Sequence, residues 1–410
     1  MPLGPRRVVV TGLGVVSPAG VGVAALWNGL LAEPPDERLR AVDDTALDAV
    51  LAPLVEVRDR RRTDRFAHLA LAAAHEALTD AGLLGPGERL DDAVGRRTAV
   101  VIGTGLAGLP SFAAAAVARH ERGERRVSPF TVPMVMPNAA AAAVSLRFGT
   151  GGPCEAVTTA CAAGAHSIAH AARLISWGLA DVAVGGGAES CLDPTTIAGF
   201  ANMTALSASG RSRPFDVRRD GFCAAEGAGV LVLEPWEAAV ARGARPLMEV
   251  LGAGSSADHH HLTAPRPDGA GAVRCLAAAL AEGGLAPSDV RHVNAHGTST
   301  PLNDAAEAAA LREVLGHGAP GGPRSVEAPV TSIKGVTGHA LGAAGAIEAV
   351  SVALSLRHRL LPPTAGTDDV DPELGLDVVL QPRPWEPGPV LSNSFGFGGH
   401  NATLLLAPIG

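Results

Sequence analysis

The chain has 410 residues, of which 47% are hydrophobic and 18% charged, and this composition is typical of a globular protein with a large core. Its formal net charge of -8 and its aromatic content of 3% argue against a general nucleic-acid binder, which needs clustered Lys and Arg. The five cysteines have no disulfide or metal-ligand spacing, no signal-peptide pattern is present, and no apolar run reaches membrane-spanning length, so we expect a cytoplasmic protein that binds neither membranes nor nucleic acid.

The first part of the chain alternates between short apolar strands and helices. Residues 7–10 predict a strand that ends in a glycine turn at Gly12 and Gly14, and residues 128–133 predict an extended segment bounded by prolines. The remaining strands are expected at residues 98–105 and 181–184, and helices at 24–31, 66–81, 113–117 and 139–148.

A basic run precedes the helix at 66–81. It contains Arg58, Arg60, Arg61, Arg62 and Arg65. Charge runs are usually a solvated face, and the functional interpretation is a docking surface for an acidic partner.

Residues 157–166 form a β-branched run that reaches Cys161 and continues into small, helix-compatible residues. This pattern predicts a strand, a tight turn and a helix over 162–177, with Cys161 at or just before the first helical turn. Amide hydrogens and the positive dipole at a helix start lower a thiol pKa and favour a nucleophile. A free cysteine is as often a small core residue, so this segment alone leaves both interpretations open.

A strand at 229–233 and a helix at 236–242 are expected before the pattern begins again around residue 243. After that point strands are expected at 249–254, 290–295 and 329–331, and helices at 270–282, 305–315 and 340–356. This alternation favours an α/β protein with parallel sheets covered by helices, built from a duplicated unit.

Two histidines follow apolar strands in glycine-rich loops of the second half. His296 comes directly after the strand at 290–295, and His339 precedes the helix at 340–356. Each alone is more often structural, but together with a cysteine at a helix start they favour nucleophilic catalysis.

Two further motifs have competing interpretations. Residues 393–401 are either a C-terminal hairpin or a glycine turn that directs N–H groups at an oxyanion, with Phe397 as a shield. Residues 258–261, Asp-His-His-His, resemble a metal cluster, but neighbouring side chains on one loop rarely face one ion, so we favour a loop near the site without a metal.

These motifs together resemble the elongating β-ketoacyl-acyl-carrier-protein synthases of the thiolase-like superfamily. The match runs from residues 8–14 to residues 396–401 and covers essentially the whole chain. The resemblance implies a thiolase-like, duplicated α-β-α-β-α five-layered sandwich with halves at residues 1–245 and 246–410, and it implies a dimer.

The resemblance also assigns roles to residues. Cys161 matches the nucleophile, His296 and His339 the paired catalytic histidines, and Lys334 and Glu348 the charged groups that tune them. The other matches are Phe397 and Gly398 in the oxyanion hole and gate, Thr298 and Thr300 on the phosphopantetheine arm, His261 and Thr263 on a gating loop, Leu106 and Thr131 at the acyl pocket, and Arg58, Arg61 and Arg62 at the carrier-protein docking surface.

The implied activity is a decarboxylative Claisen condensation between an acyl chain on Cys161 and malonyl-acyl carrier protein, with no metal or intrinsic cofactor. The partners would be an acyl carrier protein and a second subunit, either identical or resembling a chain-length factor. A non-catalytic chain-length-factor-like subunit is the alternative, although such subunits typically lack the cysteine. A thiolase is disfavoured because no second cysteine lies in residues 393–401. Thr131, in place of a bulky aromatic residue, leaves both the type II polyketide or polyene pathway and the fatty acid pathway open.

Overall fold

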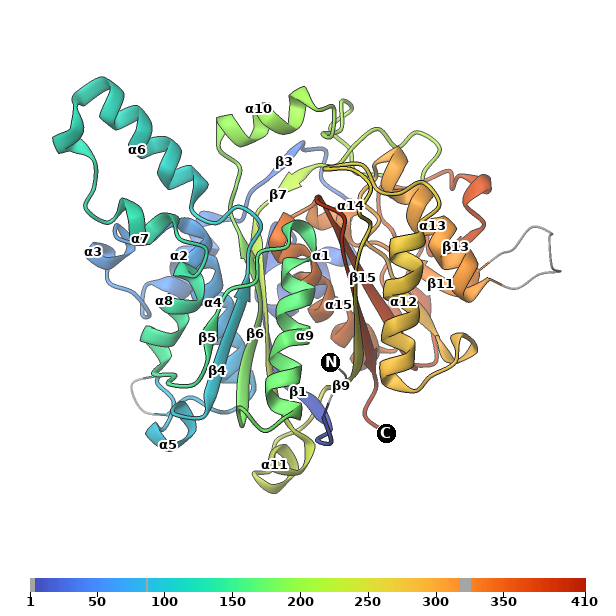
Figure 1. Ribbon diagram of the computed structural model, residues 1–410, viewed down its shortest axis with the longest axis horizontal. Helices are drawn as coiled ribbons and strands as arrows, with labels where there is room; N and C mark the ends of the chain where they lie inside the picture. The colour runs from blue at the N-terminus through green and yellow to red at the C-terminus, as the bar shows by residue number, and fades with distance from the viewer. Residues whose placement is uncertain (1–3, 86–87, 317–325) are drawn as a thin grey trace.

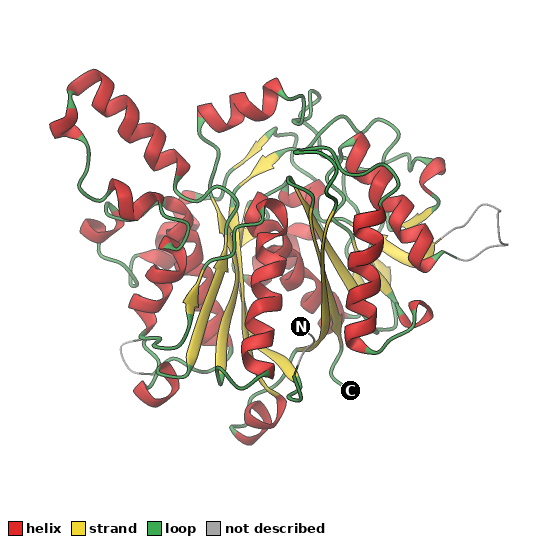
Figure 2. Ribbon diagram, in the orientation of Figure 1, coloured by secondary structure: helices red, strands yellow, loops and turns green. Residues whose placement is uncertain are grey.

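The computed structural model describes residues 4–85, 88–316 and 326–410 (Figure 1, Figure 2). Its main strands form two sheets that are joined into one continuous sheet by a short antiparallel pairing of β1 with β9. The first sheet contains β1 (Val8–Ser17), β4 (Thr98–Gly103), β5 (Cys154–Glu155), β6 (Val182–Glu189) and β8 (Gly227–Pro235), with β2 (Gly20–Val21) beside β1. The second contains β9 (Met248–Ala257), β10 (His292–Asn294), β11 (Val326–Thr331), β15 (Val390–Gly396) and β16 (His400–Ala407), with β13 (Leu376–Val378) at its edge.

The two sheets repeat one topology. The strand order is β5-β4-β6-β8-β1 in the first sheet and β11-β10-β15-β16-β9 in the second, which is the same order when each set is counted along the chain. In both sheets the first two pairings are parallel and the last two antiparallel. The sheets are therefore mixed rather than parallel as expected. This repetition supports our proposal that residues 1–245 and 246–410 are two similar halves.

Helices occupy three layers around the sheets. Two buried helices, α9 (Ala163–Ser176) and α15 (Ala344–His358), lie between the sheets and contact strands of both. On the outside, α4 (Arg65–Asp80) and α8 (Ala139–Phe148) lie on the side of the first sheet, and α12 (Ala270–Gly283) and α13 (Pro301–Leu315) on that of the second. The predicted five-layered α/β fold is confirmed.

The two central helices cross closely near their N-terminal ends. A Cβ atom on Gly164 would lie 2.9 Å from Ala346 N, and one on Gly345 would lie 3.0 Å from Ala165 Cβ. The glycines let the helix backbones approach each other directly below the turns that precede them.

The glycine turn predicted at Gly12 and Gly14 is wrong, because both residues lie inside β1. A Cβ atom would lie 2.1 Å from Ala77 O at Gly12 and 1.9 Å from Ala73 O at Gly14. These glycines are needed for the close packing of α4 on β1.

The segment predicted to be extended at 128–133 instead enters α7 (Thr131–Val135), which can hold Pro133 because a first-turn residue needs no intrahelical N–H donor. It follows α6 (Leu109–Arg122), which has no buried residue.

The shorter helices are α1 (Val23–Leu30), α2 (Asp44–Leu51), α3 (Val57–Arg60), α5 (Asp92–Gly95), α10 (Pro194–Asn202), α11 (Trp236–Ala241) and α14 (Lys334–Thr337), and the remaining strands are β3 (Leu39–Arg40), β7 (Ala224–Ala225), β12 (Leu360–Leu361) and β14 (Arg383–Pro384). Among the described residues, no helix is long and apolar enough to cross a membrane.

Candidate active site

Cys161 lies in a short 3-10 turn, Ala160–Ala162, directly before α9, and only 7% of it is exposed. The preceding β-branched residues are not a strand, because β5 ends at Glu155. Ala160 adopts a left-handed φ of 49°, which turns the chain sharply into the helix. The thiol is thus held at the start of a buried helix.

The structure brings both histidines to this thiol. His339 Nε2 lies 3.1 Å from Cys161 Sγ, and the rings of His296 and His339 meet edge to face with centroids 5.2 Å apart. One ligand atom from each of the three residues lies within 4.8 Å of the others. His296 follows β10, whereas His339 is held between the backbone of Cys223, which accepts from its N–H at 2.8 Å, and that of Ala225, which donates to its carbonyl at 3.0 Å.

Burial dominates the ionisation of these groups. It raises the pKa of the Cys161 thiol to about 12, although the Lys334 ammonium and the Phe397 N–H favour the thiolate. It also lowers the pKa of His296 and His339 well below the ordinary value, and the Lys334 charge acts in the same direction. The sequence predicted that the helix start lowers the pKa of the Cys161 thiol. This prediction is wrong, because desolvation outweighs the helix dipole. At neutral pH all three groups are uncharged.

Lys334 and Glu348 form a buried ion pair behind the histidines. The Lys334 ammonium also donates to the His296 carbonyl at 2.5 Å and lies 3.4 Å from His296 Nδ1. The charge of Lys334 thus acts on both the position and the protonation of His296.

Glu307 is a site residue that the sequence interpretation missed. Its buried carboxylate accepts from the backbone N–H groups of His296 and Gly297, both at 2.8 Å, and from the Asn393 amide at 3.2 Å. Burial raises the pKa of Glu307 to about 7. The sequence could have pointed to Glu307 only through its place on α13, the helix that directly follows the loop of His296.

The predicted C-terminal hairpin and the predicted gate are one structure, because the β15–β16 turn reaches Cys161. The Phe397 N–H faces the Cys161 thiol. A Cβ atom on Gly396 would lie 3.0 Å from Cys161 N, so only glycine keeps this N–H accessible. Gly398 donates its N–H to Leu262 O at 2.7 Å and therefore ties the gate to the loop at 258–263 rather than facing Cys161.

A mainly apolar cavity of about 780 Å³ ends at these groups. Its lining includes Leu106, Thr263, Thr298 and Thr300, and α10 adds Phe200, which was not foreseen. Thr298 and Thr300 hydroxyls lie 2.9 Å apart. Two of the residues matched by resemblance, Thr131 on α7 and His261 in the gating loop, are not part of this lining.

The basic run is partly neutralised by acidic neighbours. Arg58 pairs with Glu56 and Asp59, and Arg62 pairs with Asp59 and lies over the Phe130 ring at 4.9 Å. Arg61 follows α3 and is exposed. In Figure 1 this segment lies at the edge of the molecule beside α7.

The donor set of Cys161, His296 and His339 is of a kind that zinc can use. A cation there would stand beside the Lys334 ammonium, which already opposes positive charge on both histidines. In the loop at 258–261, Asp258 accepts from the Asn401 amide at 2.7 Å, and His261 Nδ1 accepts from the Thr263 N–H at 3.1 Å. These atoms are engaged in holding the loop.

Comparison with known proteins gives a consistent assignment. Residues 5–239 match the family model described as beta-ketoacyl synthase, N-terminal domain, and residues 247–368 match the corresponding C-terminal domain. The chain is 40% identical to 3-oxoacyl-[acyl-carrier-protein] synthase 2 of Synechocystis sp., covering 97% of both chains, and 41% identical to that of Rhizobium meliloti, covering 98% of both.

Solved structures agree with this result. The ishigamide ketosynthase/chain length factor superposes with a TM-score of 0.88 at 32% identity, covering 99% of this chain and 100% of the other. A type II polyketide ketosynthase, bound to the hexaketide and in complex with its acyl-carrier protein, gives a TM-score of 0.85 at 32% identity with the same coverage. The chain therefore belongs to the β-ketoacyl synthase family.

Proposed function

We propose that this chain is an acyltransferase that condenses an acyl group held on Cys161 with malonyl-acyl carrier protein to give a 3-ketoacyl carrier protein. The observation that carries the proposal is the meeting of one thiol and two neutral imidazoles at the end of a cavity of about 780 Å³. No intrinsic cofactor is needed, because loss of carbon dioxide drives the condensation.

In the first half-reaction the thiolate of Cys161 attacks the thioester carbon of an acyl carrier protein. The N–H groups of Cys161 and Phe397 stabilise the oxyanion of the tetrahedral intermediate. When this intermediate collapses, the phosphopantetheine sulfur leaves and the acyl group stays on Cys161. Solvent carries away the thiol proton, and the departing sulfur takes up a proton.

In the second half-reaction malonyl carrier protein loses carbon dioxide and becomes an enolate. Neutral His296 and His339 donate N–H hydrogen bonds from Nε2 to the enolate oxygen. The enolate carbon attacks the Cys161 thioester, forms the new carbon-carbon bond and releases the thiolate. Lys334 and Glu348 orient the histidines without reacting, and Thr298 and Thr300 bind the phosphopantetheine arm.

The partners in this proposal are an acyl carrier protein and a second subunit. Two relatives support this choice, since one ketosynthase structure contains an acyl-carrier protein and another is a ketosynthase/chain length factor. Relatives named for 3-oxoacyl carrier-protein synthesis support the fatty acid pathway, and the polyketide ketosynthases support the type II polyketide pathway.

A non-catalytic chain-length-factor-like role is not favoured. Such a subunit does no chemistry and has no need for a thiol beside two oriented imidazoles. Here His339 Nε2 lies 3.1 Å from Cys161 Sγ, and Glu307 fixes the backbone of His296.

The test is incubation with acyl carrier proteins, followed by intact-mass measurement. We expect an acyl adduct on the wild-type chain that is absent in Cys161→Ala, and conversion to 3-ketoacyl carrier protein after malonyl carrier protein is added. A folded chain that gains no adduct from any short or long acyl donor, alone or with a co-encoded partner, would contradict the proposal. The length of the acyl chain that Cys161 accepts best in this assay distinguishes the fatty acid pathway from the type II polyketide pathway.

A further inference from the structure

Arg40 is a buried cation on a segment in which the sequence showed no motif. It is the second residue of β3 and is only 1% exposed. Among the residues that the structure describes, no carboxylate oxygen lies within ion-pair distance of its guanidinium. A buried charge is retained only where hydrogen bonds replace its hydration, so the partners of Arg40 indicate its role.

These partners are backbone carbonyls from two separate segments, and the Cys223 thiol also contacts the guanidinium. Nη1 donates to Gly335 O and Val336 O, both at 2.7 Å, and to Lys334 O at 3.4 Å. On the other side, Nη2 donates to Pro35 O at 3.1 Å and Nε to Glu37 O at 3.2 Å. The first three carbonyls belong to the one-turn helix α14. Lys334 O also accepts from the Gly338 N–H at 3.1 Å, whereas α14 has no further turn to supply N–H donors for Gly335 O and Val336 O.

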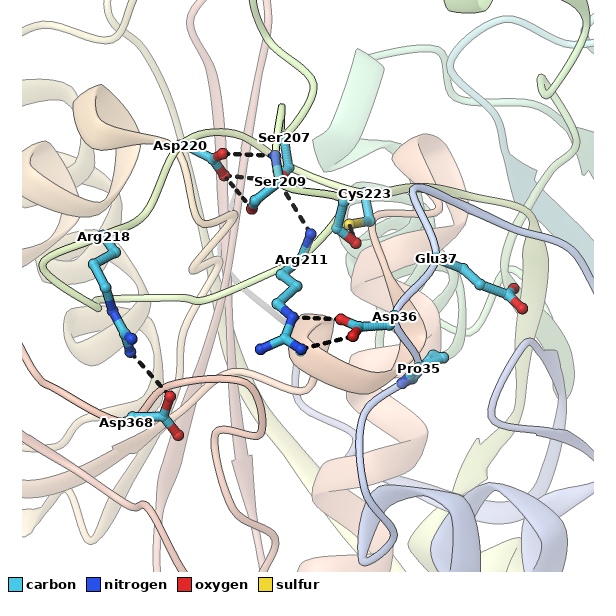
Figure 3. Close-up of polar contacts among 12 residues, drawn as sticks. Pro35, Asp36, Glu37, Ser207, Ser209, Arg211, Arg218, Asp220, Cys223 and Asp368 are labelled. Carbon is cyan, nitrogen blue, oxygen red and sulfur yellow. Dashed lines mark hydrogen bonds and ion pairs between the residues drawn. The ribbon is translucent and has the colours of Figure 1, made fainter.

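The Pro35–Glu37 side of this contact is itself anchored. Figure 3 shows Asp36 joined to Arg211 by two contacts, one of which is a 2.6 Å hydrogen bond from Arg211 Nη2. The loop of Arg211 is held in turn by the Asp220 carboxylate, which accepts from the Ser207 hydroxyl at 2.7 Å. The Arg40 guanidinium therefore links α14 to residues 35–37, which Arg211 holds in place.

The segment that Arg40 holds carries the groups behind the reactive thiol. It begins with Lys334, which contacts His296 and Glu348, and it leads through Gly338 to His339. A Cβ atom on Gly338 would lie 3.1 Å from Arg40 Cδ, so the Arg40 stem packs against the residue before His339. The main chain of Arg40 pairs with Ala225 of β7, whose N–H donates to the His339 carbonyl. Side chain and main chain of Arg40 thus act on the two ends of residues 334–339.

We propose that Arg40 is a positioning residue, whose guanidinium holds the Lys334–Thr337 turn and thereby fixes His339 Nε2 against the thiol of Cys161. The effect on condensation rests on the proposed function, whereas the effect on the thiol does not. The Lys334 charge favours the thiolate and His339 Nε2 lies 3.1 Å from the sulfur, so a displaced turn moves both groups and slows thiolate chemistry.

The test compares Arg40→Met, which keeps the stem but loses the donors, with Arg40→Lys, which keeps the charge. Cys161 reactivity is measured as the rate of carboxamidomethylation by iodoacetamide against pH, read by intact mass. For Arg40→Met we expect this rate to fall about tenfold and its pH profile to shift to higher pH. The condensation kcat should fall about 100-fold with an unchanged KM for malonyl carrier protein, since misplacement by about 1 Å has this effect. Arg40→Lys should lie between Arg40→Met and the wild type.

The matched control is Arg242→Met, which removes an arginine that donates two hydrogen bonds to Glu234 and follows α11. It should keep wild-type alkylation and condensation. A folded Arg40→Met protein with wild-type alkylation and kcat overturns the proposal. If Arg40→Met does not fold, Arg40→Lys decides by the same two measurements, and failure of both to fold assigns Arg40 to folding alone and also overturns it. If Cys161 is alkylated faster in the wild type than in Arg40→Met, but the wild type catalyses no condensation, the proposed function fails and the positioning role of Arg40 stands.

Discussion

The thiol of Cys161 is surrounded by groups that act on its ionisation in opposite directions. Burial and the carboxylate of Glu189 raise its pKa, whereas Lys334 and the backbone N–H of Phe397 lower it, and the balance is a pKa of about 12. The reactive thiolate is therefore a small fraction at neutral pH, and the nearby donors stabilise it as it forms.

This balance predicts the pH dependence of Cys161 modification. The folded pKa lies above the ordinary thiol value, so the thiolate fraction grows about tenfold per pH unit up to at least about pH 10. We expect iodoacetamide alkylation of Cys161, measured by peptide mass after quenching, to rise through this range without a plateau. Cys161→Ala controls for labelling of the exposed Cys154. A plateau near the ordinary thiol pKa would contradict the predicted environment.

At the scale of elements, the β15–β16 turn reaches the reactive centre through Gly396. The Gly396→Ala substitution places a methyl group 3.0 Å from Cys161 N and 2.8 Å from Thr159 O. We expect acylation of Cys161 by acyl carrier protein to slow by about 100-fold or more, because loss of one oxyanion donor has an effect of this size. The measurement is the rate of acyl adduct formation by intact mass.

Gly151→Ala is the matched control, since its Cβ would meet only an ordinary contact at 3.4 Å. That variant should acylate like the wild type. Equal rates for Gly396→Ala and wild type would show that the turn does not shape an oxyanion site.

The segment after α3 carries the proposed docking surface for the carrier protein. Reversal of Arg61 and Arg62 to Glu should slow acylation by acyl carrier protein several-fold and remove its salt dependence, while small-molecule thioesters react as before. Arg245→Glu, a charge reversal at an exposed residue that follows α11, should change neither rate. Equal loss with both donor types would point to damage of the active site instead of docking.

The sequence predicted many elements but few of their close contacts. The periodic pattern of α4 identifies the helix within one residue, because one face of it is buried in the core. By contrast, Gly12 and Gly14 look like turn residues, and only the packing of α4 on β1 explains them. Their role depends on Ala73 and Ala77 of α4, which lie far along the chain from Gly12 and Gly14, and no local pattern shows this contact.

The same limit applies to the site. Cys161, His296 and His339 stand in recognisable motifs, and the structure brings all three together. Glu307 and Arg40 act through backbone groups of other segments, and nothing in their own neighbourhoods distinguishes them from surface charges. Their burial is decided by the tertiary fold.

At the scale of the whole molecule, an apolar face remains uncovered on the arm formed by α6 and α7. Phe112 is 54%, Val117 53% and Val132 70% exposed. Exposed apolar groups of this size on neighbouring elements are typical of an interface, which agrees with the dimer proposed above. Figure 1 shows the arm projecting from the layered body.

Charges on this arm should therefore change the oligomeric state. We expect Phe112→Lys with Val117→Lys to shift the chain from dimer to monomer in size-exclusion chromatography with light scattering. Leu179→Lys, at a residue 53% exposed on a different surface, should leave the dimer intact. A wild-type chain that is monomeric without a partner, and becomes dimeric only with a co-encoded subunit, would assign the arm to a heterodimer.

The close crossing of α9 and α15 at Gly164 and Gly345 has an evolutionary consequence. The turns that lead into these helices read Cys-Ala-Ala-Gly-Ala from residue 161 and Gly-Ala-Ala-Gly-Ala from residue 342, and they contact each other. Gly342 is thus the counterpart of Cys161, and a side chain there would lie 2.3 Å from Gly105 N. An ancestral duplication would have produced two equivalent turns. The backbone of Gly105 now excludes a side chain at residue 342, so each chain has a nucleophile only at the turn of Cys161.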